Sequence, residues 1–287
     1  MKTLIQNYTS ALSTEPMYLN RCLAECEEQA ELWANPNISA FDAFDKFNPD
    51  LFITHYTFLT EDILKYLSGK PNMSMALNIT GASQEEILRI DEMCGPINLP
   101  LMFTNFYDAN RIESKKTKTI SLYPAADIFL APIPTPEFSI EACILSVQEN
   151  NLYQDRIENK KTYHKFSLNP QANYGDMSLD IASMRSFYSK YQEIILADDI
   201  NFVTSQVLFD SILGGNKVSI EVAEQQKSTL NKILAELFVH QEADDIGEVI
   251  RSQVKSRHNC FKRSARLFRS LKSEDIAKKL EGISSKL

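Results

Sequence analysis

Glycine and proline are scarce in this chain, and long apolar runs are missing from it. The 287 residues include 8 glycines and 11 prolines, which excludes collagen-like and glycine- or proline-rich low-complexity sequences. No stretch of 18 apolar residues occurs, so we expect no membrane-spanning helix. Residues 1–7 carry one positive charge and only two strongly apolar residues in a row, so we expect no secretory signal there.

Several motifs of nucleotide-dependent and hydrolytic enzymes are also absent from the sequence. No Gly-x-x-x-x-Gly-Lys-Ser/Thr is present, which argues against a P-loop ATPase. No Gly-x-Gly-x-x-Gly follows a predicted strand, which argues against a Rossmann dehydrogenase. The Gly-x-Ser-x-Gly turn that carries the nucleophile of α/β-hydrolases is missing as well.

Cysteines are few, odd in number and widely spaced. No cluster of cysteine or histidine completes a zinc site with any of them. We interpret them as reduced thiols, which predicts a cytoplasmic protein. The five are Cys22, Cys26, Cys94, Cys143 and Cys260.

The charge is distributed unevenly along the chain. The whole sequence has a formal charge of −8, but residues 251–287 contain 11 basic and 3 acidic side chains. Leu267 and Leu271 in this segment are spaced as on one helix face. One interpretation is a C-terminal helix that packs its apolar side on an acidic body. The alternative is a basic surface for a polyanion, such as nucleic acid or an anionic membrane.

Strand and helix patterns alternate along the chain with short connections, which predicts parallel sheets covered on both faces. In the first half, Pro16 suits the first turn of a helix that Thr14 caps and that we expect to reach about Trp33. Further helices are predicted to begin near residues 60 and 84. Strands are predicted at residues 2–6, after the turn in the run 47–56, and at 73–79, 99–104 and 127–130.

Three prolines between residues 131 and 137 indicate a stiff crossover into a second α/β series. Strands are expected there at residues 142–147, 165–168, 193–196, 202–203 and 217–220, and helices at 179–191, 205–213, 224–237 and 244–254. We therefore predict an α/β fold of two Rossmann-like domains facing across a cleft. The predicted divisions are an N-terminal domain at 1–135, a C-terminal domain at 136–250 and a basic helical segment at 251–287 that could cross back.

The segment after the predicted strand at 202–203 has the features of a phosphate site. Thr204, Ser205 and Gln206 stand where a helix begins, and free backbone N–H groups at that position favour an anion. Asp210 lies one and a half turns on, where a carboxylate could reach a ribose diol. The simpler interpretation is a capped helix that stops at Gly214-Gly215.

The run from Ser205 through Asp210 to Gly215 resembles the donor-site segment of GT-B glycosyltransferases, and the CgeB-like, spore-maturation type is the most similar group. In that family an acidic residue in the donor helix binds the ribose, five positions before a glycine that precedes a strand. Residues 188–196, and Pro49-Asp50 before an apolar strand, are similar to other elements of these enzymes. The absence of Asp-x-Asp disfavours a metal-dependent GT-A enzyme and agrees with a metal-independent one.

The resemblance also implies a role for the loop after the predicted strand at 165–168. In the family this loop faces the nucleotide base and the sugar, so Asn173, Tyr174 and Gly175 become candidate donor-binding residues. Arg185 is a candidate partner for the diphosphate. A plain turn is the alternative, because asparagine, proline and glycine are turn residues.

Polar side chains follow the strands of the first half and are expected to converge on the same cleft. His55 is the candidate catalytic base, since a histidine can take a proton from an acceptor hydroxyl at neutral pH. The alternative is a histidine that only hydrogen-bonds a backbone carbonyl at a strand end. The candidate acceptor-side residues are Tyr8, Asn78, Thr80 and Asn105.

The sequence thus predicts a cytoplasmic glycosyltransferase that moves a sugar from a nucleotide-sugar donor, with UDP- or GDP-sugar as co-substrate, to an acceptor hydroxyl. No further cofactor and no metal are expected. The acceptor could be a polysaccharide, a protein or a nucleic acid, and peripheral membrane contact is compatible with the basic segment. The alternative is a non-catalytic nucleotide- or sugar-binding module whose basic tail contacts a polyanion such as DNA.

Overall fold

A computed structural model describes most of the chain, and the chain divides into two compact units. The first unit holds the described residues up to Tyr123 together with Cys260–Leu287, and the second holds those from Pro124 to Asn259. Each unit is a layered α/β structure and is presented separately below. The described residues are 1–8, 14–33, 39–105, 114–129, 138–146, 153–167, 188–197, 205–238 and 246–287.

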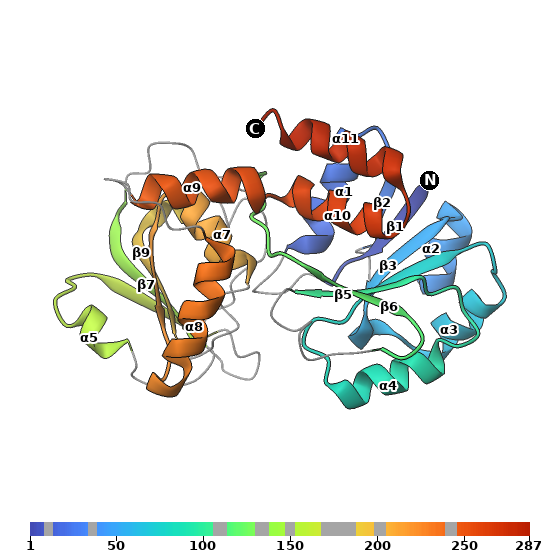
Figure 1. Ribbon diagram of the computed structural model, residues 1–287, viewed down its shortest axis with the longest axis horizontal. Coiled ribbons are helices and arrows are strands. Elements are labelled where there is room, and N and C mark those ends of the chain that lie inside the picture. Colours follow the sequence, from blue (N-terminus) through green and yellow to red (C-terminus); the bar gives the residue numbers. More distant parts are fainter. Residues whose placement is uncertain are drawn as a thin grey trace. The chain divides into compact units, whose positions relative to one another are not determined.

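The first unit is built on a six-stranded sheet in which every strand pair is parallel (Figure 1). The order across the sheet is β2-β1-β3-β4-β5-β6. The central strands are apolar on both faces, as parallel strands between helices must be. Their bounds are β1 Lys2–Gln6, β2 Gln29–Trp33, β3 Leu51–His55, β4 Ser74–Asn78, β5 Leu101–Asn105 and β6 Lys118–Leu122.

Local capping chemistry sets where the helices of the first unit begin. Ser39 and Thr60 accept hydrogen bonds from backbone N–H groups of the first turn, and Ser83 forms a capping box with Glu86. These caps satisfy N–H groups that a helix start leaves unpaired. The helices before β6 are α1 Glu15–Glu25, α2 Ala40–Phe47, the 3₁₀ turn η1 Tyr56–Phe58, α3 Glu61–Ser68 and α4 Gln84–Met93.

The Pro49-Asp50 element fixes the register between β1 and β3. Asn48 ends α2 in the left-handed conformation, and Pro49 cannot continue a helix. The backbone N–H of Lys2 then donates to the Asp50 carboxylate at 2.7 Å, while the Asp50 N–H donates to the Lys2 carbonyl at 2.9 Å. This short segment therefore aligns the starts of the two central strands.

The C-terminal helices α10 Cys260–Ser270 and α11 Glu274–Ser284 belong to the first unit. Figure 1 shows α1 and α10 on the opposite face of the sheet from α3 and α4. The buried face of α10 carries Phe261, Leu267 and Phe268, each at most 2% exposed. Residues 260–287 therefore complete the core of the first unit on that face.

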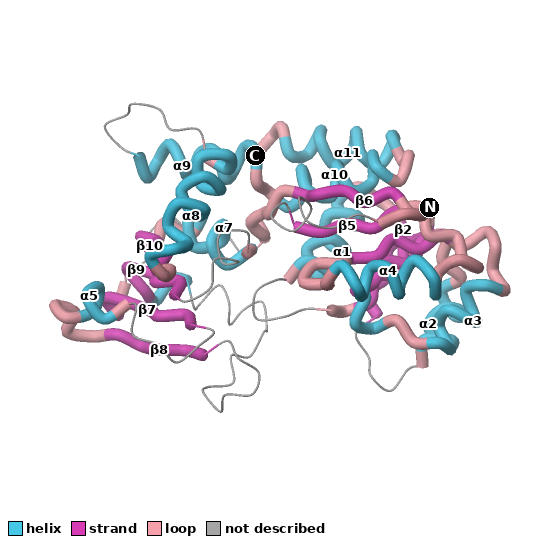
Figure 2. The backbone as a smooth tube through the Cα atoms, turned by 60° about the horizontal axis from the view of Figure 1, so that its bottom comes forward, coloured by secondary structure: helices cyan, strands magenta, loops and turns pink. Residues whose placement is uncertain are grey.

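The second unit holds a four-stranded parallel sheet in the order β10-β9-β7-β8 (Figure 2). Its core includes Ile144 and Ile195 of the central strands, which are packed with Tyr153 and Ile157. The strands are β7 Ile140–Ser146, β8 Tyr163–Ser167, β9 Tyr191–Ala197 and β10 Lys217–Glu221. The helices are α5 Gln154–Ile157, α7 Gln206–Leu213, α8 Glu224–Leu237 and α9 Ile246–Arg257.

The predicted fold class is confirmed, because both units are α/β structures with parallel sheets. The return of residues 260–287 to the first unit agrees with the expected C-terminal helix that crosses back. The N-terminal part of the first unit ends at Tyr123, whereas the sequence placed the division at residue 135. The basic segment 251–287 is shared, since α9 lies in the second unit and α10 in the first.

Two element predictions in the first half are wrong. The helix expected from residue 14 to about 33 ends at Glu25, because Glu27 takes a positive φ of 58° and Gln29–Trp33 pairs with β1 as an edge strand. The strand expected at 127–130 is also wrong for Asp127, Ile128 and Phe129, which lie outside any strand. The strand next to β5 is instead β6, in which only Leu122 is buried, so its sequence gives no buried-strand signal.

Truncating Phe268 tests whether α10 is part of the core of the first unit. Phe268 is fully buried, so Phe268→Ala should lower the free energy of unfolding by about 3–5 kcal/mol. Urea denaturation followed by circular dichroism measures this loss. Lys278→Ala on the exposed side of α11 is the control and should leave stability unchanged. Equal stability of the two variants would contradict this packing role.

Candidate functional site in the first unit

The strand order of the first unit creates a topological switch point at the carboxyl ends of β1 and β3. β2 lies on one side of β1 and β3 lies on the other, so the direction in which the chain adds strands reverses there. Ligands of open parallel sheets bind beyond the carboxyl ends at such a point. Tyr8 follows β1 and His55 ends β3, and the centroids of their rings are 5.7 Å apart. Asn78 ends the neighbouring strand β4.

Both ring nitrogens of His55 have partners in the first unit. Nε2 lies 3.1 Å from the Thr80 carbonyl oxygen, and Nδ1 lies 2.8 Å from the Thr57 hydroxyl. Burial lowers the pKa of His55, although the Thr80 carbonyl and the Glu15 carboxylate act in the opposite direction. The imidazole is therefore neutral at pH 7 and holds a lone pair that can accept a proton. The contact with Thr80 matches the alternative interpretation of this residue as well.

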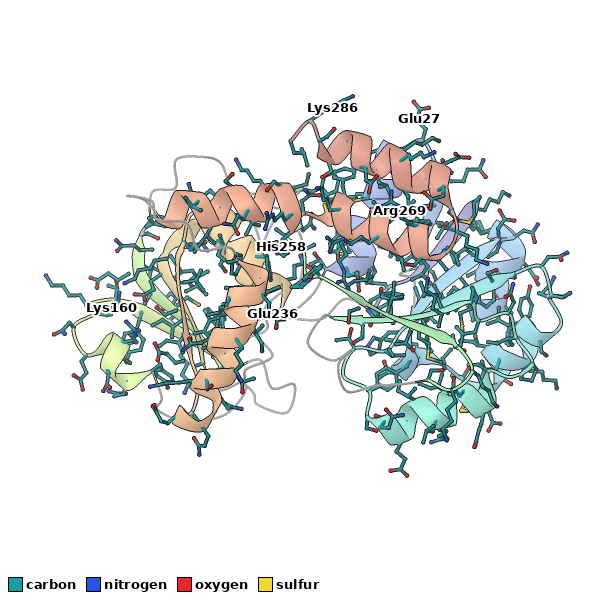
Figure 3. The ribbon with its side chains drawn as sticks, in the orientation of Figure 1. Glu27, Lys160, Glu236, His258, Arg269 and Lys286 are labelled. Carbon is teal, nitrogen blue, oxygen red and sulfur yellow. The ribbon has the colours of Figure 1, made fainter. Side chains whose placement is uncertain are left out.

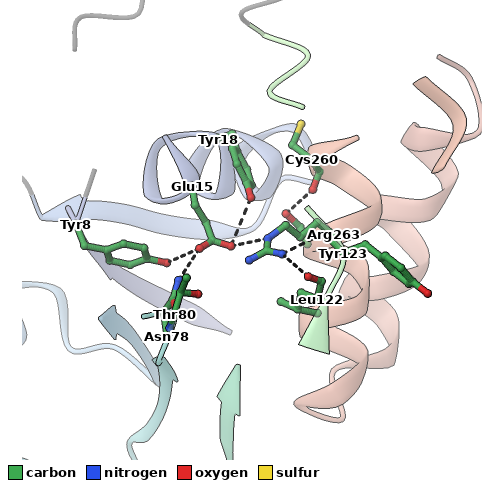
Figure 4. Close-up of polar contacts among 10 residues, drawn as sticks. Tyr8, Glu15, Tyr18, Asn78, Thr80, Leu122, Tyr123, Cys260 and Arg263 are labelled. Carbon is green, nitrogen blue, oxygen red and sulfur yellow. Dashed lines mark hydrogen bonds and ion pairs between the residues drawn. The ribbon is translucent and has the colours of Figure 1, made fainter. Parts of the chain in front are cut away.

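Asn78, Thr80 and Tyr8 are joined to one buried carboxylate, that of Glu15 in the first turn of α1 (Figure 4). The Asn78 side-chain amide donates to Glu15 at 2.7 Å, and the Tyr8 hydroxyl donates at 3.3 Å. The Asn78 carbonyl oxygen in turn accepts the Thr80 backbone N–H at 2.9 Å. Burial, followed by the nearby Glu15 charge, raises the pKa of Tyr8 well above its ordinary value, so its hydroxyl remains a donor.

Arg263 of α10 neutralises Glu15 inside the first unit (Figure 4). Its Nε donates to Glu15 at 2.6 Å, and its Nη1 donates to the carbonyl oxygens of Leu122 and Tyr123 at 3.0 and 2.9 Å. The two charged side chains are only 5% and 6% exposed. Burial alone would lower the pKa of Arg263, and the Glu15 carboxylate raises it beyond its usual value. Arg263 therefore stays protonated although it lies away from water.

The structure thus brings four candidate residues of the sequence into one cluster, namely Tyr8, His55, Asn78 and Thr80. Asn105 ends β5, and its side chain lies outside the described part of the chain. Sequence reasoning missed Glu15 and Arg263. A carboxylate beside Pro16 in a first turn looks like ordinary helix chemistry, and its partner is 248 residues away.

In the second unit, the predicted donor helix exists as α7, with Ser205 at its N-cap. Ser205 and Gln206 are each 6% exposed, and Asp210 is 4% exposed. One Asp210 oxygen accepts the Asp127 backbone N–H at 2.7 Å, and the other accepts the Gln206 side-chain amide at 2.9 Å. Asp210 thereby ties the start of the second unit to α7.

The environment of Asp210 is also unfavourable for a free carboxylate. Burial, followed by the nearby Asp127 carboxyl, raises the pKa of Asp210 well above its ordinary value, against the hydrogen bonds that it accepts. Ribose binding by this residue stays a prediction. The predicted residues Asn173, Tyr174, Gly175, Arg185 and Thr204 lie outside the described residues.

Several basic residues of the C-terminal helices contact acidic or aromatic groups within the first unit. Arg269, which projects from α10 near α11 in Figure 3, binds Glu281 at 2.7 Å. Lys279 binds Glu28 at 2.6 Å, and the Arg266 guanidinium lies 4.6 Å from the centre of the Tyr123 ring. These three cations therefore face this unit's own acidic and aromatic groups.

The described ranges contain neither a candidate membrane span nor a cluster of candidate metal ligands. No helix there has both the length and the apolar character needed to cross a membrane. In the same ranges, no three histidine, cysteine, aspartate or glutamate side chains come together as metal ligands.

Comparisons with known proteins return only remote similarity. No family model matches the chain, and no curated protein matches it. Among solved structures, it is similar to the spinosyn forosaminyltransferase SpnP, with 11% identity, 99% of each chain covered and a TM-score of 0.39. It is also similar to MurG of Acinetobacter baumannii, with 9% identity, 99% of each chain covered and a TM-score of 0.34.

A third similar structure is a protein of a different kind. It is an extracellular ligand-binding receptor from Desulfohalobium retbaense, with 12% identity, a TM-score of 0.26, and 96% of this chain and 52% of that chain covered. Similarity at this level carries no argument about activity. The fold assignment rests on the strand order and the parallel pairing given above.

Removing one member of the Glu15–Arg263 pair should be strongly destabilising. Arg263→Met leaves a buried carboxylate without its cation, so we expect a loss of about 3–5 kcal/mol in the free energy of unfolding. The double variant Glu15→Gln/Arg263→Met should lose less than Arg263→Met alone, because no buried charge remains. Urea denaturation of the four members of this cycle measures the coupling, with Arg266→Met on the same helix as the control. Additive losses would contradict the pairing.

The two interpretations of Asp210 predict different behaviour of Asp210→Ala. The observed hydrogen bonds predict a loss of about 1–3 kcal/mol in stability without any ligand, because two buried donors lose their acceptor. A ribose role predicts lost affinity for UDP or GDP at unchanged stability. Urea denaturation and calorimetric titration of both nucleotides separate the two, and exposed Asp155→Ala in the same unit is the control.

Proposed function

We propose that this protein is a metal-independent glycosyltransferase that uses a nucleotide sugar, with the acceptor hydroxyl bound in the first unit. The observation that carries the proposal is the position of His55, neutral and joined to a polar cluster at the switch point of a parallel sheet. A general base must be unprotonated at the working pH and must lie at the reacting hydroxyl. His55 meets the first requirement, and its place in the fold suits the second.

The carboxylate of Glu15 supports the choice of the first unit for the acceptor. In many nucleotide-binding sheets the start of the helix after the first strand binds a phosphate. Here that helix is α1, and its first turn already holds a buried carboxylate. Arg263 already balances that carboxylate, so the pair offers no net positive charge to a phosphate, whereas a neutral hydroxyl ligand needs none. The ligand of this edge is therefore an uncharged acceptor in our proposal.

The reaction proposed for this cluster is a displacement at the anomeric carbon of the donor. The acceptor O–H bond breaks as its proton passes to His55, and the acceptor oxygen forms a bond to the anomeric carbon. The bond from that carbon to the nucleotide diphosphate breaks, and the diphosphate leaves with the electron pair. Stabilising this leaving group is the main electrostatic task of the donor side. We assign that side to the second unit, on the sequence resemblance of residues 205–215.

A non-catalytic binding module is the second candidate, and the state of Asp210 favours it. Both oxygens of that carboxylate already accept hydrogen bonds from the second unit itself. A transferase fold that has lost its donor chemistry could keep such an internal contact. This candidate predicts nucleotide or sugar binding without cleavage of any donor.

A donor screen followed by variants of His55 tests the proposal. We expect one of UDP, GDP, ADP, CMP or TDP to raise the melting temperature, and the matching sugar nucleotide to be hydrolysed slowly. His55→Ala should then lower turnover by about 10²–10⁴-fold while donor affinity stays near wild type. Coupled nucleotide release gives turnover, and calorimetry gives affinity.

His164→Ala is the matched control for this screen. His164 lies in β8 of the second unit and contacts the Tyr191 hydroxyl at 3.0 Å, so it should leave turnover unchanged. Full activity of His55→Ala would remove the assignment of the base. Binding of a nucleotide with no cleavage of any donor sugar would favour the binding module.

A further inference from the structure

A continuous line of hydrogen bonds leads from helix α10 to the ring of His55 inside the first unit. Arg263 Nε donates to Glu15 at 2.6 Å, and the other Glu15 oxygen accepts from Asn78 at 2.7 Å. The Asn78 carbonyl oxygen accepts the Thr80 N–H at 2.9 Å. The Thr80 carbonyl oxygen then lies 3.1 Å from His55 Nε2.

Chemistry fixes the direction of every bond in this line. A guanidinium can only donate and a carboxylate can only accept, so the NH₂ group of Asn78 must face Glu15. The oxygen of that amide is then left for the Thr80 N–H. A backbone carbonyl has no proton to give, so the proton in the last bond belongs to His55 Nε2.

We propose that Arg263, Glu15 and Asn78 are positioning residues that hold His55 as its Nε2–H tautomer, with Nδ1 as the proton-accepting nitrogen. The proton-accepting role rests on the function proposed above, whereas the tautomer stands on the hydrogen bonds alone. This assignment gives the basic C-terminal helix a function in the site besides packing.

The surroundings of Nδ1 support its role as the acceptor of the proton. Nδ1 lies 2.8 Å from the hydroxyl of Thr57 and accepts the Thr57 backbone N–H at 3.4 Å, and Thr57 lies exposed in the turn η1. Nε2 instead points at backbone and is engaged there. A substrate hydroxyl that replaces the Thr57 hydroxyl would meet the Nδ1 lone pair. Its O–H bond would break as the Nδ1–H bond forms, and its oxygen would keep the electron pair for attack.

The tautomer can be measured without any substrate. Two-bond ¹H–¹⁵N spectra of the histidine side chains, recorded at a pH above the pKa of His55, should show a predominantly Nε2–H ring in the wild type. Asn78→Ala releases the Thr80 segment, so the ratio of Nε2–H to Nδ1–H should fall about fivefold, the equivalent of one net hydrogen bond. Asn98→Ala is the control, since Asn98 binds Ser74 away from this line and should leave the ratio unchanged.

Two further variants keep the test decisive if Asn78→Ala is unstable. Thr57→Val removes the hydroxyl partner of Nδ1 and keeps the Thr57 backbone N–H that Nδ1 accepts, so His55 should remain the Nε2–H tautomer. Arg263→Gln should lower the ratio, whereas Arg266→Gln on the same helix should not. A wild-type ring with its proton on Nδ1, or a tautomer that changes in Thr57→Val but not in Asn78→Ala, would overturn the inference.

The outcomes also separate this inference from the proposed function. An Nε2–H ring that responds to Asn78 in a protein without transfer activity supports the positioning role and removes the function. Transfer activity that depends on His55, together with an Nδ1–H ring at rest, supports the function and overturns the positioning role.

Discussion

The buried ion pair of Glu15 and Arg263 is the constraint on which the first unit depends. Two charges away from water are tolerated only when they are paired and hydrogen-bonded, and here every recorded partner is a donor or acceptor of the right kind. The pair links α1 to α10 and, through Asn78, reaches the carboxyl end of β4. One interaction therefore serves the core and the candidate site together.

This arrangement explains the composition of the C-terminal segment. A +8 excess over residues 251–287 suggested a surface for polyanions, but α10 and α11 direct several of these cations at acidic side chains of the first unit. An acidic body needs such a partner to limit self-repulsion in the folded state. Residues 260–287 are a structural part of the first unit, whereas α9 belongs to the second.

The two candidate sites differ in how much of each could be predicted from local sequence patterns. Residues after parallel strands must gather at one sheet edge, so Tyr8, His55, Asn78 and Thr80 could be grouped from strand positions alone. The start of α7 was also placed correctly, because an N-cap serine and a glycine stop are local signals. The hydrogen bond from the Asp127 N–H to Asp210 joins residues 83 positions apart, so no local sequence pattern indicates it.

By itself, the sequence determined the α/β class, the parallel strands and most helix starts, since these follow from hydrophobic periodicity, caps and turn residues within about ten positions. Tertiary structure decided that Gln29–Trp33 is an edge strand, because pairing with β1 outweighs helical spacing. It also decided the partner of Glu15, which lies 248 residues away. Helix packing brings that partner close, and no local pattern encodes such a contact.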